Sequence, residues 1–105
     1  MIESVRRTIM VERRYTSNDY PGAFGGFEWT GETTDLLHTP RWFADYVQEI
    51  AIGVSKKADF LETLYFTTSD NRQCVAEPGD IVLFRLGRLV VCTPDICKFF
   101  LKELM

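Results

Sequence analysis

Hydrophobic and polar residues alternate over residues 5–15, and this pattern predicts a strand with one buried face. In an extended chain Val5, Ile9 and Val11 lie on one side. The other side carries Arg6, Thr8, Glu12 and Arg14. Arginines near both ends of such a strand discourage pairing with other chains, so they need no phosphate ligand to explain them.

The hydrophobic pattern changes to a helical period after residue 38. In "HTPRWFADYVQEIAIG" Thr39 is a candidate N-cap and Pro40 suits the first helical position. A helix ending near Gly53 would have an apolar stripe formed by Phe43, Tyr46, Val47 and Ile50. We therefore expect an amphipathic helix that packs on a sheet.

Four further strands follow, separated by turn residues. The expected strands are residues 60–68, 72–77, 81–86 and 88–92, with "SDNR" and Pro78-Gly79-Asp80 as turns. Gly87-Arg88 would form a type II′ turn, because this turn needs glycine at its first central position. Thr93-Pro94-Asp95 then starts a short C-terminal helix.

The last hairpin is apolar on both faces. The type II′ register places Leu86 opposite Leu89 and Phe84 opposite Val91, and it gives one fully apolar face: Val82, Phe84, Leu86, Leu89 and Val91. The second face is also too apolar for water, so a helix, the preceding loop or a partner should cover it: Ile81, Leu83, Arg85, Val90 and Cys92.

These elements predict an α+β fold with a small antiparallel sheet of about five strands, one amphipathic helix and a short C-terminal helix. A chain of 105 residues is long enough for one core, so residues 1–105 are expected to form a single domain. No apolar run is long enough to span a bilayer, and the expected location is the cytoplasm.

Residues 16–32, "TSNDYPGAFGGFEWTGE", have the composition of a loop but contain many aromatic residues. The rings of Tyr20, Phe24, Phe27 and Trp29 either fold back into the core or contact a partner. Phe99 raises the same alternative, because it lies on the polar side of the C-terminal helix.

The net charge of −3 is unevenly distributed. Residues 15–70 carry nine acidic side chains against three basic ones, a local net charge of −6. This balance disfavours non-specific binding of nucleic acid. It fits either a solvated surface or docking on a basic partner.

No motif in the chain predicts catalysis, a metal site or a cofactor. Cys74, Cys92 and Cys97 lack the spacing of a zinc site, and they suit buried thiols in a reducing compartment. His38 is the only histidine, and its spacing from serine and cysteine suggests no nucleophile–base pair. We expect a protein that is not an enzyme.

The stretch "PGDIVLFRLGRLVVCTPDICKFF" resembles the end of a family of small tailed-bacteriophage and prophage proteins, which share a PGD step and a C-x-PDI motif. "FEWTGE" resembles the WTG step of the same family. The resemblance covers about half of the chain and carries over no catalytic residue. It implies a phage protein in the bacterial host cytoplasm, of a class that often binds and blocks host machinery.

The leading hypothesis is therefore a phage accessory protein that binds a host or phage protein, such as part of a nucleic-acid-handling complex, and inhibits a host process or a CRISPR-type immune system. The predicted contacts are Phe24, Phe27, Trp29, Trp42 and Phe99. The predicted acidic rim consists of Asp19, Glu28, Glu32, Asp45 and Glu49.

Two alternatives remain open. A small ligand such as a nucleotide would occupy a pocket between the aromatic loop and the sheet. Single-stranded nucleic acid would bind through four arginines: Arg6, Arg14, Arg85 and Arg88.

Overall fold

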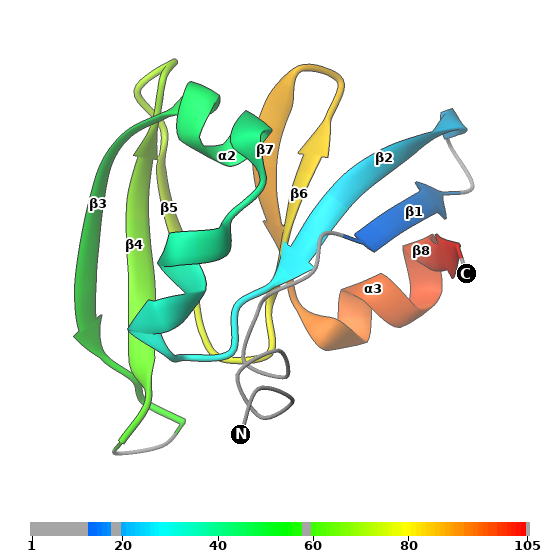
Figure 1. Ribbon diagram of the computed structural model, residues 1–105. Helices are drawn as coiled ribbons and strands as arrows, with labels where there is room; N and C mark the ends of the chain where they lie inside the picture. Colours follow the sequence, from blue (N-terminus) through cyan, green and yellow to red (C-terminus); the bar gives the residue numbers. More distant parts are fainter. Residues whose placement is uncertain (1–12, 18–19, 58–59, 105) are drawn as a thin grey trace, which may run out of the picture.

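The computed structural model of the protein describes residues 13–17, 20–57 and 60–104, and it shows two small antiparallel sheets joined by short helices (Figure 1). The five-stranded sheet has the order β7-β6-β2-β1-β8, formed by Arg88–Cys92, Ile81–Arg85, Tyr20–Glu28, Arg13–Ser17 and Leu101–Leu104. The three-stranded sheet has the order β3-β4-β5, formed by Val47–Val54, Glu62–Thr68 and Gln73–Ala76. The helical elements are η1 (Thr33–His38), α2 (Arg41–Tyr46) and α3 (Pro94–Phe100). The predicted α+β class is confirmed.

The two sheets and α2 share one hydrophobic core. Its buried side chains come from both sheets and from α2: Phe27, Trp29, Phe43, Leu64, Phe66, Ala76, Val82 and Leu89. In Figure 1 α2 lies at one end of the molecule, between β3 and the β6–β7 hairpin. Both sheets pack against this cluster, which contains most of the large buried side chains. This packing fixes the position of one sheet relative to the other.

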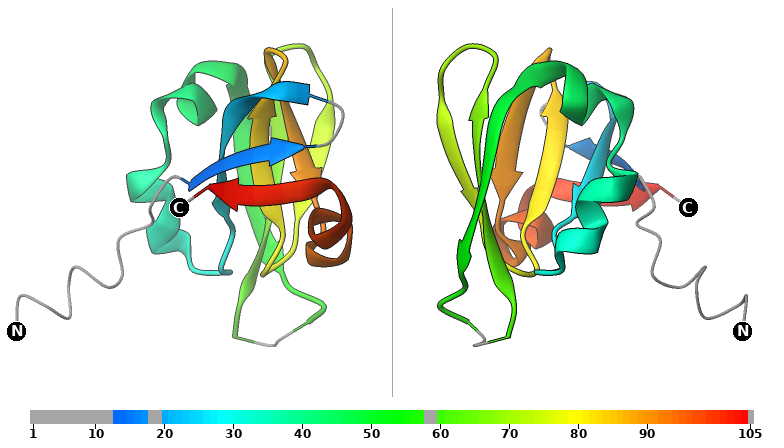
Figure 2. Two further views of the ribbon diagram at one scale, coloured as in Figure 1. Left: turned by 90° about the vertical axis from the view of Figure 1, so that its right-hand side faces the viewer. Right: turned by 60° about the vertical axis from the view of Figure 1, so that its left-hand side comes forward.

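A second cluster lies on the other face of the five-stranded sheet. Tyr15, Phe24 and Leu83 are buried there, and Ile81, Val90 and Cys92 pack against them. The chain reaches β8 through α3, so that β8 lies beside β1 at the far edge of this sheet (Figure 2). The expectation that both faces of the last hairpin are covered is confirmed. The strand at residues 101–104 was not predicted.

The expectation of a loop over residues 16–32 is wrong for residues 16–17 and 20–28, whereas residues 29–32 lie outside helices and strands. Residues 20–28 form β2, which is the central strand of the five-stranded sheet and pairs with β1 and β6. Glycine occurs at residue 26 of this strand because the neighbouring side chains leave no room for a larger residue. A Cβ atom at Gly26 would lie 2.7 Å from both the Leu83 and the Tyr15 side chains. Of the strand predicted at 5–15, residues 13–15 belong to β1, and residues 5–12 lie outside the described residues.

The helix predicted from Pro40 to Gly53 is also wrong in its second half. The helix α2 ends at Tyr46, and residues 47–54 form β3, which pairs with β4 from Val54↔Glu62 to Val47↔Thr68. β-Branched residues at 47, 50, 52 and 54 favour the strand, and pairing with β4 decides between the two patterns. The helix has Pro40 at its N-cap position without a side-chain cap, so Thr39 does not have the predicted role.

Strands β4, β5, β6 and β7 lie where the sequence predicts them, but the hairpin turn differs from the prediction. Arg85 pairs with Arg88, so the two-residue loop is Leu86-Gly87 and not Gly87-Arg88. Both loop residues have positive φ, 54° for Leu86 and 75° for Gly87, which is a type I′ turn. Phe84 therefore pairs with Leu89, and Leu86 leaves the predicted apolar face for the tip of the hairpin.

The WTG and PGD steps meet in the structure. The Trp29 amide donates to the Asp80 carbonyl at 2.9 Å, and the Gly79 amide donates to the Trp29 carbonyl at 2.7 Å. Gly79 has a φ of +97°, and the Asp80 carboxylate accepts a hydrogen bond from the Glu77 amide at 3.0 Å. Because they form a turn and its contact with β2, these motif residues have structural roles.

Arg72 ties the three-stranded sheet to the five-stranded sheet. Its Nη2 donates to the Leu89 carbonyl on β7 at 2.8 Å, and its Nε contacts Asp70 at 3.2 Å. Asp70 also accepts a hydrogen bond from the Thr68 hydroxyl and lies 3.7 Å from Arg88.

Among the residues that the structure describes, no helix has the length and apolar character needed to cross a membrane.

Candidate protein-binding surface

Three of the predicted contact aromatics belong to the core. Phe27 and Trp29 have no exposed surface, and Phe24 is buried in the second cluster. Trp29 also donates from Nε1 to the Glu62 carbonyl at 2.8 Å. The burial alternative is thereby confirmed for these rings. Phe27 and Trp29 have no surface to present to a partner, whereas Phe24 is 5% exposed and lines the hollow described below.

Trp42 is half-buried and forms part of an aromatic group at the surface. Its ring stacks on Phe27 at a centroid distance of 5.9 Å and on Phe84 at 5.5 Å. Tyr46 contacts the same Phe84 ring at 4.8 Å and is 39% exposed. The helix α2 and the strand β6 thus present three rings together, of which sequence analysis singled out one.

A hollow of about 340 Å³ lies beside this aromatic group. It arises because small residues occupy the face of β2 next to Phe84: Gly25 pairs with Phe84 on one side and with Arg14 on the other. Ala23, two residues earlier, lies on the same face and is also small. Around this floor stand Arg14, Trp42, Phe84 and Leu86.

Leu86 is the most unusual residue of this surface. It is 66% exposed and has a φ of 54°, in the left-handed region that a residue with a Cβ rarely adopts. Type I′ turns favour asparagine, aspartate or glycine at this position. We call the surface formed by the following residues the Trp42 patch: Arg14, Ala23, Trp42, Tyr46, Phe84 and Leu86.

The predicted acidic rim is dispersed. Glu28 pairs with Ile81 on the face of the second cluster and lies 3.8 Å from Arg13, whereas Glu49 lines a different hollow on the three-stranded sheet. Asp45 lies next to the patch on α2, 3.9 Å from Arg41, and Glu32 is exposed before η1. Asp19 and the side chain of Phe99 lie outside the described residues.

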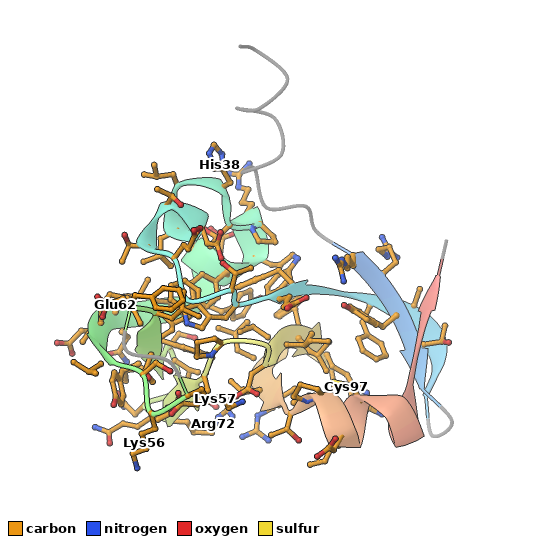
Figure 3. All side chains as sticks on the ribbon, turned by 90° about the horizontal axis from the view of Figure 1, so that it is seen from below. His38, Lys56, Lys57, Glu62, Arg72 and Cys97 are labelled. Atoms are coloured by element: carbon orange, nitrogen blue, oxygen red, sulfur yellow. The ribbon has the colours of Figure 1, made fainter. Side chains whose placement is uncertain are left out.

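Among the described residues, Cys97 contacts Cys92 but is not brought together with His38. Cys74, Cys92 and Cys97 are free thiols. Burial and a hydrogen bond with Cys92 raise the pKa of the Cys97 thiol to about 12, so it stays protonated and is a poor nucleophile. His38 and Cys97 lie on opposite sides of the molecule (Figure 3). In the described part of the chain, His, Cys, Asp and Glu form no cluster suited to a metal ion.

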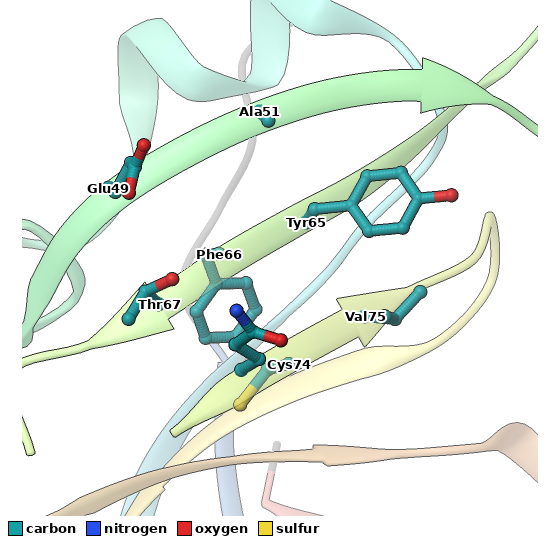
Figure 4. Close-up of a pocket in the computed structure, with 8 residues that line it drawn as sticks. Glu49, Ala51, Tyr65, Phe66, Thr67, Cys74 and Val75 are labelled. Carbon is teal, nitrogen blue, oxygen red and sulfur yellow. The ribbon is translucent and has the colours of Figure 1, made fainter. Parts of the chain in front are cut away.

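A second hollow, of about 420 Å³, lies on the three-stranded sheet (Figure 4). Two rows of paired side chains cross this face: Glu49, Thr67 and Gln73, and then Ala51, Tyr65 and Val75. The Tyr65 ring lies over Gly53, where a Cβ atom would be 2.7 Å from Cε2, and this leaves space on the Thr67 side.

The structure shows where the residues of the two alternative site predictions lie. Phe27 and Trp29, from the segment predicted to be a loop, lie in the core. Ala23, Phe24 and Gly25 of the same segment line the hollow of about 340 Å³, so binding of a small ligand between this segment and the sheet stays a prediction. Of the four arginines, Arg14 shares a face with Phe84, whereas Arg85 and Arg88 share the opposite face with Leu83. Arg6 lies outside the described residues.

Sequence analysis missed Tyr46, Phe84 and Leu86 as surface residues. The first two belong to apolar patterns that are typical of a core. A signal was present for Leu86, because a leucine before glycine in a two-residue turn is unusual.

Comparison with protein-family models, curated proteins and solved structures gives no match to this chain.

Proposed function

We propose that this protein acts by binding another protein through the Trp42 patch, without catalysing a reaction. The observation that carries the proposal is Leu86, a large apolar side chain held in solvent by a backbone conformation that is unfavourable for leucine. Such strain costs about 1–3 kcal/mol and is concentrated at functional sites in proteins. Burial of a leucine side chain by a partner contributes about 1.5–3 kcal/mol, which offsets this cost in a complex.

The neighbouring residues support the same reading. Tryptophan, tyrosine and arginine are the residue types that most often dominate binding energy. The patch contains Trp42 and exposed Arg14 around one hollow, and Tyr46 beside Phe84. The rings are held by contacts with Phe84 and Phe27, so little side-chain entropy is lost when a partner docks. We infer a partner that offers an apolar side chain to the hollow and a carboxylate to Arg14.

The partner's origin is proposed from the sequence motifs. The PGD and C-x-PDI steps resemble those of small tailed-phage proteins, and this resemblance supports the proposal of an accessory protein in an infected bacterial cytoplasm. Small phage proteins without catalytic motifs often bind and block host machinery, and a bacterial immune complex of the CRISPR type is one such target. A bacterial lysate is therefore the appropriate source of partner.

Affinity capture from a bacterial lysate tests the proposal when wild type and two matched variants are compared. Ala23→Lys places a long charged side chain on the floor of the hollow, and it is expected to reduce the captured partner at least tenfold. Val75→Lys makes a similar change at an exposed position of β5 and should capture the partner like wild type. A partner captured equally by both variants would contradict the site.

Calorimetry separates this proposal from small-ligand binding. Titration of the protein with cyclic and linear nucleotides should give no heat of binding. Heat that is present with wild type and lost with Ala23→Lys would overturn the proposed function and assign the hollow to a small ligand.

A further inference from the structure

The strand β3 has an exposed, apolar edge. Among the described strands β3 has one neighbour, β4, and its other side carries unpaired backbone groups. Its eight residues include one charged side chain, Glu49, and no lysine or proline. Ile52 is 36% exposed and Val54 is 76% exposed. Proteins usually guard such an edge with charges, proline or a bulge, because it is a template for pairing with another strand.

The part of β3 without a guard is residues 49–54. The one irregularity lies between Val47 and Glu49, and from Glu49 onward each residue pairs in regular register with β4. Residues 50–54 contain no charged side chain. This segment is long enough for an antiparallel pair of five residues on each strand.

We propose that β3 pairs with β3 of a second copy of this chain, antiparallel and about a twofold axis at Ile52. Paired residues of an antiparallel ladder share a face, so this register places Ile52 opposite Ile52 and Ile50 opposite Val54 of the second copy. Three exposed apolar side chains from each copy then cover one another. The two three-stranded sheets become one continuous six-stranded sheet.

The opposite face of the strand is self-complementary in the same register. Ala51 lies opposite Gly53, so two small residues meet on each side of the axis. The Tyr65 ring already lies over Gly53, with its hydroxyl 3.5 Å from the place of a Cβ atom. The Tyr65 ring of one copy would therefore lie next to the Ala51 methyl group of the other. Because the ladder contains no charge, like charges do not oppose association at the axis.

A second copy fits better than an unrelated strand because one sequence satisfies both sides of this ladder. Isologous contacts require a self-complementary patch, and closed twofold dimers are the commonest oligomers. The dimer uses β3, whereas the Trp42 patch uses β2, α2 and the β6–β7 hairpin. The inference therefore does not depend on the proposed function.

Sedimentation equilibrium tests the dimer, with Ile52→Lys and Val54→Lys as disrupting variants. Wild type should be a dimer whose dissociation constant rises at least tenfold in Ile52→Lys, because two lysines would meet at the axis. Val54→Lys, at a 76% exposed position, provides the same test if Ile52→Lys fails to fold. Val75→Lys is the matched control and should remain dimeric, and circular dichroism checks folding.

Cysteine cross-linking tests the register. In Ile52→Cys the two introduced thiols would lie opposite each other, and an added oxidant that accepts two electrons should join them in one intermolecular disulfide. Ala51→Cys lies opposite Gly53 and should cross-link at least tenfold less. A monomeric wild type at all concentrations would overturn the dimer, and equal cross-linking of both variants would overturn the register.

Discussion

Trp29 shows how the motif residues act as scaffold. Its ring is fully buried, its Nε1 donates to the Glu62 carbonyl, and its backbone bonds to Gly79 and Asp80. One residue therefore joins β2 to the PGD turn and to the start of β4. These contacts explain the WTG and PGD steps without reference to a ligand.

Trp29→Phe should lower the free energy of unfolding by about 2 kcal/mol. The smaller ring leaves a cavity, and the Glu62 carbonyl loses its donor. Chemical denaturation measures the change. Trp42→Phe is the comparison, and its loss should be smaller because Trp42 is half-buried. Equal losses would contradict the assignment of Trp29 to the core.

Asp70 gives the protein an acid-sensitive contact. The Thr68 hydroxyl, which donates a hydrogen bond, and the Arg72 guanidinium hold the pKa of the Asp70 carboxyl below its ordinary value. A lowered pKa in the folded state means that the contribution is complete above the ordinary carboxyl pKa and is lost as the pH falls through the lowered value.

Asp70→Asn should therefore be less stable than wild type at pH 7, and the difference should shrink as the pH falls below about 4. Thermal unfolding of both proteins between pH 7 and pH 3 measures this difference. A difference that stays constant over this range would show that the charge of Asp70 contributes no stability.

At the scale of elements, the strands were predictable where the alternation of residues agreed with turn chemistry. This holds for β4 to β7, which are bounded by "SDNR", Pro78-Gly79 and Gly87. It fails for residues 47–54, where a helical stripe and β-branched residues coexist and pairing with β4 decides the outcome. It fails again for β2, because its glycines and proline are typical of a loop and its role depends on two neighbouring strands.

Arg72→Met tests the connection between the two sheets. Methionine retains the apolar stem but removes the bond to the Leu89 carbonyl and the ion pair with Asp70. We expect a loss of about 1 kcal/mol in stability and faster hydrogen exchange at the amides of β7. Arg41→Met is the control: Arg41 is highly exposed, so its ion pair with Asp45 should contribute little. Unchanged exchange in β7 would contradict the connecting role of Arg72.

At the scale of the whole molecule, the order of the expected strands and helices predicted the fold class but not the site. The sequence shows that aromatic residues are present, but it does not show which of them are buried. Packing between the two sheets buries Phe27 and Trp29. The Trp42 patch is formed by residues from three distant segments, around 14–25, 42–46 and 84–86. No short motif encodes such a surface, because it depends on the pairing of β1, β2 and β6.

The most direct test of the account is a paired measurement of stability and partner affinity in Leu86→Asn. Asparagine tolerates positive φ, so the variant should be more stable than wild type by about 1 kcal/mol. It should also bind the captured partner at least tenfold more weakly, because the exposed leucine is lost. Leu37→Asn is the matched control: Leu37 is 77% exposed on η1, outside the patch, and its substitution should leave affinity unchanged. A more stable Leu86→Asn protein that binds the partner as tightly as wild type would contradict the account.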